Sequence, residues 1–296
     1  MTIDFKALAA KAASEGANQT VAKSGGGDYE PPAAGPALVR FVGYAELGKQ
    51  KGTFQGKPTI KDKVLMIFEL VGKRHPPAER DGVKIPQFIS IEESLSLNEK
   101  ANFFKLFQRM NYRQDAAHMA GLLGEGFKAE VVHDTWKDKQ GKDRVTATLK
   151  GAGGYTIAPP RKEDEDSETG WVDVAVPLAL SQIKCFLWQQ ADMAQWGSLF
   201  IDGEYPERKN DKGEVTAPAK SKNVIQDKIK NATNFQGSPI YVLLAANGQS
   251  LDVPTVDEQD EPAGPAQQEA PAPKSPVSQP TGKATSPSND ALGGIV

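Results

Sequence analysis

A cluster of cations surrounds one aromatic ring between two strongly apolar segments, near residue 50. Phe54 stands at its centre, and Asp62 is its single carboxylate. The cations are Lys49, Lys51, Lys57, Lys61 and Lys63. Lysines can contact the phosphates of a nucleic acid while an aromatic ring stacks on a base. A solvated loop with lysines for solubility would have the same composition, so this segment alone does not establish binding.

Residue types suited to catalysis are sparse. His75, His118 and His133 have no spacing typical of metal ligands, and His133 fits a structural role on a strand. The chain has neither a Gly-x-Ser-x-Gly nucleophile elbow nor a Gly-x-x-x-x-Gly-Lys-Ser/Thr phosphate loop. The acidic run at 163–166 is dense and loop-like, so we expect hydrated carboxylates rather than metal ligands. We therefore expect no enzyme, no cofactor and no metal site.

The cations must be positioned by strands, and residues 38–150 supply them. Runs rich in β-branched and aromatic residues predict a hairpin of strands 38–47 and 63–71, with 48–62 as its loop. Strands are also expected at 87–91, 127–136 and 144–150. A helix is expected to begin at Ser96 with Glu99 completing a capping box, and a short turn of helix at 118–123.

The order strand, strand, strand, helix, strand, strand is that of a five-stranded OB barrel. We therefore predict an α+β, mainly β chain, in which 38–150 forms an OB-like barrel. Side chains alternate along a strand, so one set should face outwards. That set is Arg40, Tyr44, Phe88, Trp136, Arg144, Thr146 and Lys150, flanked by the lysines of 49–63 and by the charged turn with Lys137, Lys139 and Lys142.

Residues 151–250 are expected to form a helical and β elaboration packed on the barrel. The patterns predict a strand at 171–176, a helix at 177–200, a hairpin or loop at 202–219, a helix at 221–231 and a strand at 240–246. Cys185, the only cysteine, lies in the apolar pattern of the helix predicted at 177–200 and should be a small core residue. With one cysteine, no intramolecular disulfide can form.

The two ends differ from the body in composition. Residues 1–37 contain Gly25-Gly26-Gly27 and Pro31-Pro32 and predict a flexible arm. Residues 251–296 are rich in Pro, Gln, Ser and acids, which predicts a disordered tail. Residues 38–150 hold 20 Lys+Arg against 14 Asp+Glu, whereas the tail holds 2 against 7. A basic body with an acidic tail suggests a polyanionic partner.

This plan resembles that of the single-stranded DNA-binding proteins of replication. The sequence around Gly52-Thr53-Phe54-Gln55-Gly56-Lys57-Pro58 is similar to sequences of proteins encoded by tailed bacteriophages. The resemblance covers roughly residues 36–150. It implies a tail that recruits replication proteins and competes with DNA. The tail here departs from the bacterial pattern, because it ends in Ala291-Leu292-Gly293-Gly294-Ile295-Val296 rather than in an acidic cluster followed by Pro-Phe.

The leading hypothesis is a phage-encoded, non-catalytic protein that coats single-stranded DNA in replication or recombination with little sequence preference. No apolar run approaches the roughly 18 residues of a membrane span, so we expect a cytoplasmic protein without a membrane partner. The alternative is a virion structural or assembly protein, whose subunits could exchange arms in a homo-oligomer. A third hypothesis is a metal-dependent nuclease, which would require turnover of labelled DNA.

Overall fold

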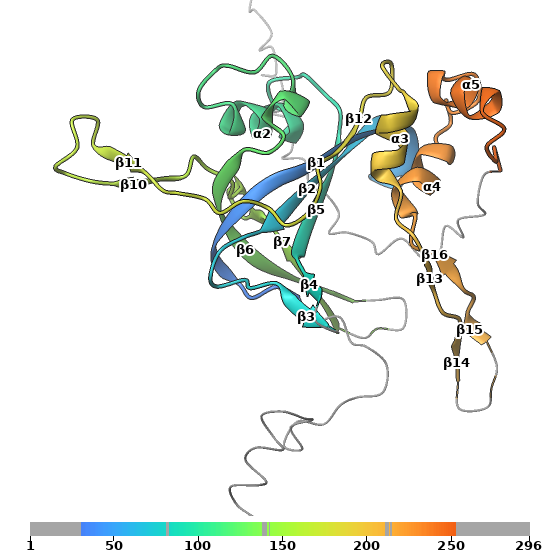
Figure 1. The fold of residues 1–296 in the computed structure, drawn as a ribbon, viewed down its shortest axis with the longest axis horizontal. Coiled ribbons are helices and arrows are strands. Elements are labelled where there is room, and N and C mark those ends of the chain that lie inside the picture. Colours follow the sequence, from blue (N-terminus) through green and yellow to red (C-terminus); the bar gives the residue numbers. More distant parts are fainter. Residues whose placement is uncertain are drawn as a thin grey trace, which may run out of the picture. The chain divides into compact units, whose positions relative to one another are not determined.

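The computed structural model describes residues 31–80, 83–137, 141, 143–210, 213 and 215–252. They form a mainly β structure built around a large antiparallel sheet, as predicted (Figure 1). The expected flexible arm over 1–30 and disordered tail over 253–296 lie outside the described residues. The strand that follows the arm already begins at Gly35, so residues 35–37 belong to the sheet instead.

The strands of the body are β1 (Gly35–Phe54), β2 (Lys57–Leu70), β3 (Ala78–Arg80), β4 (Val83–Ile85), β5 (Gln87–Ser94), β6 (Gly126–Lys137), β7 (Asp143–Thr148), β8 (Lys150–Gly151) and β9 (Gly154–Tyr155). Later strands are β10 (Arg161–Glu163), β11 (Trp171–Asp173), β12 (Lys184–Phe186), β13 (Glu204–Tyr205), β14 (Arg208–Lys209), β15 (Val215–Ala217) and β16 (Lys220–Ser221). The helical elements are α2 (Asn102–Met110), the 3-10 turn η1 (Met119–Leu122), α3 (Met193–Leu199), α4 (Val224–Lys230) and α5 (Pro239–Ala246).

The main sheet has the strand order β5-β2-β1-β6-β7, and all four of these pairings are antiparallel. Apart from the small β3–β4 hairpin, the order of strands and helix over 35–148 is as predicted. The predicted closure into a barrel is not formed by backbone pairing, because no hydrogen-bonded ladder joins β5 to β7 in the described part of the chain. A side chain links these two regions instead. The buried Glu93 of β5 accepts hydrogen bonds from the Tyr155 hydroxyl of β9 and from Asn102.

β1 pairs with β2 along one edge, and three segments distant from one another in sequence cover its other edge. β6 pairs with residues 35–40, and the Glu125 carbonyl accepts from the Phe41 amide at 3.0 Å. β12 then pairs with Gly43–Ala45 in parallel, and the Thr233 amide donates to the Lys49 carbonyl at 2.8 Å. A strand of 20 residues can be stable here because its backbone groups find partners along nearly its entire length.

Two irregularities in β1 change the predicted alternation of its side chains. The register against β2 shifts between Phe41 and Gly43 and again between Glu46 and Gly48. A bulge inserts one residue and moves the following side chains to the other face. Tyr44 was predicted to face outwards, but it is fully buried beside Phe41 and Phe68 in the inner core.

The apolar side chains form two separate cores. The inner core lies between the sheet and α2 and includes Val39, Phe41, Phe68, Phe127 and Leu106. The outer core lies on the opposite face of β1 and β2, under β12, α3, α4 and α5. It includes Leu47, Phe186, Trp188, Trp196, Ile225, Ile229, Ile240 and Leu244. Both faces of the basal part of β1–β2 are therefore buried.

α2 begins five residues later than predicted, because its N-cap is Ala101 and not Ser96. Its buried residues are Phe103, Leu106 and Met110, as the spacing indicates, but its first helical residue is Asn102 and no side chain caps it. The preceding segment is a turn in which the Asn98 carboxamide accepts from the Lys100 amide at 2.9 Å. The predicted capping box of Ser96 and Glu99 is therefore wrong, since Asn98 between them makes its own local turn.

Residues 177–200 do not form one helix. Residues 174–183 form an extended strap, β12 follows, and only Met193–Leu199 is helical, capped by the Asp192 carboxylate at 2.7 Å from the Gln195 amide. That hydrogen bond lowers the pKa of the Asp192 carboxyl. Cys185 is thus a half-buried strand residue, not a helical core residue, and burial raises the pKa of its thiol.

The remaining predictions for this region are partly confirmed. The hairpin over 202–219 is present as the β13–β16 and β14–β15 ladders, and the helix over 221–231 is present as α4. The predicted strand at 171–176 shortens to β11, which pairs with β10. The predicted strand at 240–246 is wrong, because these residues form α5. Ser238 caps this helix and Pro239 opens it, a start signal that outweighs the β-branched run after it.

Candidate nucleic-acid interface

The lysine-rich segment predicted as a loop is a two-stranded arm. β1 and β2 stay paired from Gly48↔Lys63 to Phe54↔Lys57, and Gln55 and Gly56 make the turn with φ of 50° and 75°. Two positive φ values in a two-residue turn suit the right-handed twist of a hairpin. The pairing register therefore assigns each lysine to one face of a twisted two-stranded ribbon, which an irregular loop would not do.

The two faces of this arm differ. Pairing places Phe54, Lys57 and Lys61 on one face, and the Lys61 ammonium lies 5.3 Å from the centroid of the Phe54 ring. The other face carries Lys49 and Lys51 together with the exposed Ile60, Lys51 lying directly opposite Ile60. An aromatic ring flanked by cations on a ribbon is suited to stacking a base while lysines contact the phosphates on either side of it.

The base of the arm is fixed to the C-terminal segment. A Cβ atom on Gly48 would lie 2.3 Å from the Trp188 ring, so only glycine allows this approach. The Lys49 amide donates to the Asn234 side chain at 2.7 Å, and Gln50 donates to the Lys228 carbonyl at 3.0 Å. Among the described residues, the hydrogen bonds to residues 228–234 end at Gln50, and we call residues 48–63 the arm.

A second ribbon is formed by the ends of β6 and β7. Trp136 and Arg144 face each other in register, and the Trp136 indole donates to the Thr146 hydroxyl at 2.9 Å. Lys137 pairs with Asp143 at 2.8 Å between exposed side chains. Val145, which was predicted to face inwards, is exposed because the ribbon continues past the inner core. Lys139 and Lys142 lie outside the described residues.

Two predicted contact residues are used inside the structure. Arg40 donates from all three guanidinium nitrogens, to the carbonyl groups of Gly124, Val176 and Pro177. It therefore holds the strap against β1. The Tyr44 hydroxyl donates to Glu46 at 3.3 Å, and burial, with a further contribution from Glu46, raises its pKa above the normal value. Neither side chain is available to a ligand, which corrects their predicted role.

The strap also covers the outer face of β2. The buried Glu69 carboxylate accepts from the Leu180 amide at 2.7 Å and from the Ser181 amide at 3.0 Å. Glu69 and Phe88 face each other in register on β2 and β5, and Phe88 remains 41% exposed at this margin. The outer face of the middle strands is thus covered by the chain itself, and the predicted ligand path across it is not open.

The other predicted lysines are paired with carboxylates. Lys63 lies 3.6 Å from Glu92, whose other oxygen lies 2.7 Å from Lys228. Lys150 lies 3.6 Å from the buried Glu93 and 5.5 Å from the ring centroid of Tyr155. The structure therefore brings together Lys49, Lys51, Phe54, Lys57 and Lys61 on the arm, and separately Trp136 and Arg144 on the β6–β7 ribbon.

The histidines have structural contacts. His75 is buried and its Nε2 donates to the Ala33 carbonyl at 2.7 Å, and His133 Nε2 donates to Pro32 at 2.8 Å. His118 Nδ1 accepts from the Ala120 amide at the start of η1. In the described ranges, no three His, Cys, Asp or Glu side chains are arranged to hold a metal ion, and no helix is long and apolar enough to cross a membrane.

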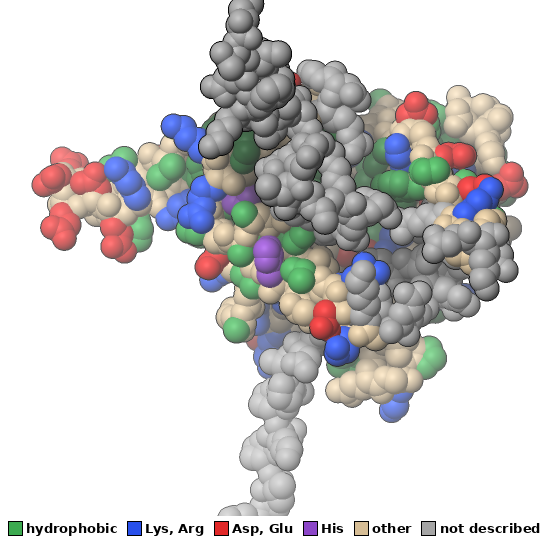
Figure 2. Space-filling view, turned by 90° about the horizontal axis from the view of Figure 1, so that it is seen from below, with side chains coloured by type: hydrophobic (Ala, Val, Ile, Leu, Met, Phe, Trp, Pro, Cys, Tyr) green, Lys and Arg blue, Asp and Glu red, His purple; other side chains and the backbone are tan. Residues whose placement is uncertain are grey.

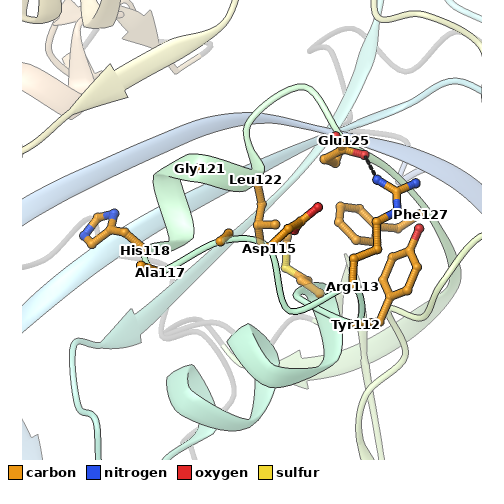
Figure 3. Close-up of a pocket in the computed structure, with 11 residues that line it drawn as sticks. Tyr112, Arg113, Asp115, Ala117, His118, Gly121, Leu122, Glu125 and Phe127 are labelled. Carbon is orange, nitrogen blue, oxygen red and sulfur yellow. Dashed lines mark hydrogen bonds and ion pairs between the residues drawn. The ribbon is translucent and has the colours of Figure 1, made fainter.

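A cavity of about 430 Å³, which the sequence patterns did not predict, lies between the end of α2, η1 and the start of β6. Met110, Leu122 and Phe127 supply buried apolar walls. Figure 3 shows Tyr112 and Arg113 at one end, and Asp115 with its carboxylate directed towards the centre. Residues 111–118 have no strand or helix periodicity. The one sequence signal there is the close spacing of Tyr112, Arg113 and Asp115.

Two guanidinium groups lie against the Tyr112 ring. The Arg113 Cζ atom is 5.1 Å from the ring centroid and the Arg161 Cζ atom is 4.9 Å from it. Each arginine pairs at 3.1 Å with an exposed carboxylate, Arg113 with Glu125 and Arg161 with Asp173. Arg161 opens the β10–β11 hairpin, whose tip carries the acidic run, and Figure 2 shows cations at the base of this hairpin and acids at its tip.

Comparisons with protein-family models, with curated proteins and with solved structures find no significant match to this chain.

Proposed function

We propose that this protein binds single-stranded DNA through its β1–β2 arm and its β6–β7 ribbon, without catalysis. The observation that carries the proposal is the strand order β5-β2-β1-β6-β7 with α2 between β5 and β6. An OB fold orders its five strands in this way, and its ligand contacts include the loop between strands one and two and the loop between strands four and five. The arm and the ribbon occupy these two places.

We further propose that the sheet forms an OB-type barrel in which side-chain contacts join β5 to the segment that follows β7. Glu93 on β5 contacts Lys150 on β8 and Tyr155 on β9, which directly follow β7. Burial, followed by the adjacent Glu93 charge, raises the pKa of the Tyr155 hydroxyl, so it stays protonated and donates to the carboxylate. This buried contact would replace the backbone ladder that closes other small barrels.

The residues proposed to contact DNA are fewer than the sequence suggested. Since the strap and the outer core cover the middle strands, binding would depend on the arm and the ribbon. Phe54 and Trp136 would stack bases, and Lys49, Lys51, Lys57, Lys61 and Arg144 would contact phosphates. Cations on ribbons read no base edges, so the proposed binding has little sequence preference.

The test is a fluorescence anisotropy titration of a labelled oligothymidine at several salt concentrations. Affinity should fall with salt, with a logarithmic slope of about 0.7 for each phosphate neutralised. Phe54→Ala should weaken binding by about 1–3 kcal/mol, because one stacked base is lost. Trp171→Ala is the control, since Trp171 is another large aromatic residue, 46% exposed, but stands beside the acidic run. Binding that is absent, or that does not respond to salt, would contradict the proposal.

A further inference from the structure

We propose that the cavity beside Tyr112 binds a single nucleotide unit, with its phosphate on Arg113 and Arg161 and its base against Asp115. This inference rests on the proposed function and extends it to a second contact, away from the arm and the ribbon. It gives the protein a preference for certain bases at one nucleotide of the bound DNA, whereas the contacts at the arm and the ribbon have little base preference.

The phosphate would bind to the two arginines at Tyr112. Their guanidinium groups lie 5.1 Å and 4.9 Å from one ring centroid, so both approach the same aromatic ring. A guanidinium fork matches the oxygens of a phosphate with two parallel hydrogen bonds. Their present partners, Glu125 and Asp173, form exposed ion pairs, which contribute little and can be exchanged for a doubly charged phosphate.

The backbone around Arg161 is also fixed. The Lys128 ammonium donates to the Arg161 carbonyl, and the Lys128 and Ala158 amides exchange hydrogen bonds with each other's carbonyl groups at 3.0 Å and 2.9 Å. Lys128 thereby places a further positive charge beside the Arg161 backbone. This backbone is thus held in place before any ligand arrives, which lowers the entropic cost of binding.

The base would enter the cavity itself. Its volume of about 430 Å³ lies within the usual range for small-molecule sites, and Met110, Leu122 and Phe127 supply apolar walls for a planar ring. The carboxylate of Asp115 points into this space (Figure 3). An ionised carboxylate only accepts hydrogen bonds, so at position 4 of a pyrimidine it favours the donating amine of cytosine over the O4 acceptor of thymine, which it would repel.

The experiment is a ligand-observed NMR titration of the full-length protein with dCMP and with dTMP. We expect saturable binding of both, with dCMP about tenfold tighter, as one charge-assisted hydrogen bond would give. The Arg113→Gln, Arg161→Gln double variant should lose binding of both nucleotides. Asp115→Asn should keep binding but remove the preference for dCMP, because a carboxamide can also donate to thymine.

Lys162→Gln is the matched control. Lys162 is exposed and follows Arg161 on β10, so its side chain points to the opposite face of that strand and its loss should leave both titrations unchanged. Thermal unfolding of each variant shows that it is folded. Equal affinity of the intact protein for dCMP and dTMP, no saturable binding, or unaltered titrations in the double variant would overturn the inference.

Failure of this inference can be distinguished from failure of the proposed function. Phe54→Ala should weaken oligothymidine binding and leave dCMP binding unchanged, since the arm and the cavity share no residue. If dCMP does not bind while oligothymidine does, only the nucleotide cavity is disproved. If dCMP binds and oligothymidine does not, the arm is not a DNA contact and the cavity remains.

Discussion

The basal and distal halves of the β1–β2 hairpin are continuous in backbone but opposite in environment. The basal half, up to Leu47 on β1 and from Val64 on β2, is packed on both faces, by the inner core and by the outer core. The distal half, residues 48–63, has cations on both faces, and in the described part of the chain its hydrogen bonds to residues 228–234 end at Gln50. One half contributes burial to stability and the other exposes groups to solvent, so stability and binding should be separable by mutation.

The largest effect should come from the basal half. Phe68 is fully buried and its ring centroid lies 5.1 Å from that of Phe41. Phe68→Ala should lower the free energy of unfolding by about 3–5 kcal/mol, because it removes buried area and leaves a cavity. Urea denaturation measures this loss. Oligothymidine binding by the fraction that stays folded should be unaltered, and a loss of affinity in that fraction would show that the halves are coupled.

The boundary between the halves is set by Gly48. It has a φ of +71°, and a Cβ atom there would be 2.3 Å from the Trp188 ring and 2.8 Å from the Asn234 side chain. Gly48→Ala should cost about 2–4 kcal/mol, combining the left-handed backbone with overpacking. Gly52→Ala is the control, because its nearest neighbour would be 3.6 Å away. Similar losses in both variants of a urea titration would contradict this boundary.

The core and the arm should also differ in their response to alkaline pH. The pKa of Tyr155 is raised in the folded protein from the ordinary value of 10.0, by burial and then by Glu93. Below pH 10 the hydroxyl is protonated in both states, but above it only the unfolded chain ionises, so stability falls as pH rises. The slope should be about 1.4 kcal/mol per pH unit for this group.

Denaturation at pH 9 to 11 measures that slope, and Tyr155→Phe should reduce it by the same amount. Tyr44 has a raised pKa for the same reasons of burial and a nearby carboxylate, and it should contribute a second, independent slope. An unaltered slope in Tyr155→Phe would mean that Tyr155 ionises alike in both states.

The sequence predicted the strands and their order because alternation and β-branched residues are local signals. It failed where partners distant in sequence determine conformation. The apolar run after Pro177 has the composition of a helix, yet Arg40 and Glu69 hold its first residues extended. The burial of Tyr44 depends on a bulge that no side chain pattern reveals.

The candidate site shows the same division. The arm could be predicted, because its lysines and Phe54 are contiguous in the sequence. Its rigidity could not, because it depends on the Gln55–Gly56 turn and on contacts with residues 228–234. The cavity could not be predicted at all, since its walls from the end of α2, η1 and the start of β6 meet only in the folded chain.

The smallest effect on stability should come from the distal half. Lys51 is exposed on the arm and pairs in register with Ile60, so Lys51→Gln should change the free energy of unfolding by less than about 0.5 kcal/mol. It should nevertheless reduce the salt slope of oligothymidine binding by about 0.7, the share of one phosphate contact. Lys100→Gln, an equal charge change on an exposed residue before α2, is the control. If both variants reduce the slope alike, the lysines act through net charge and not through a located contact on the arm.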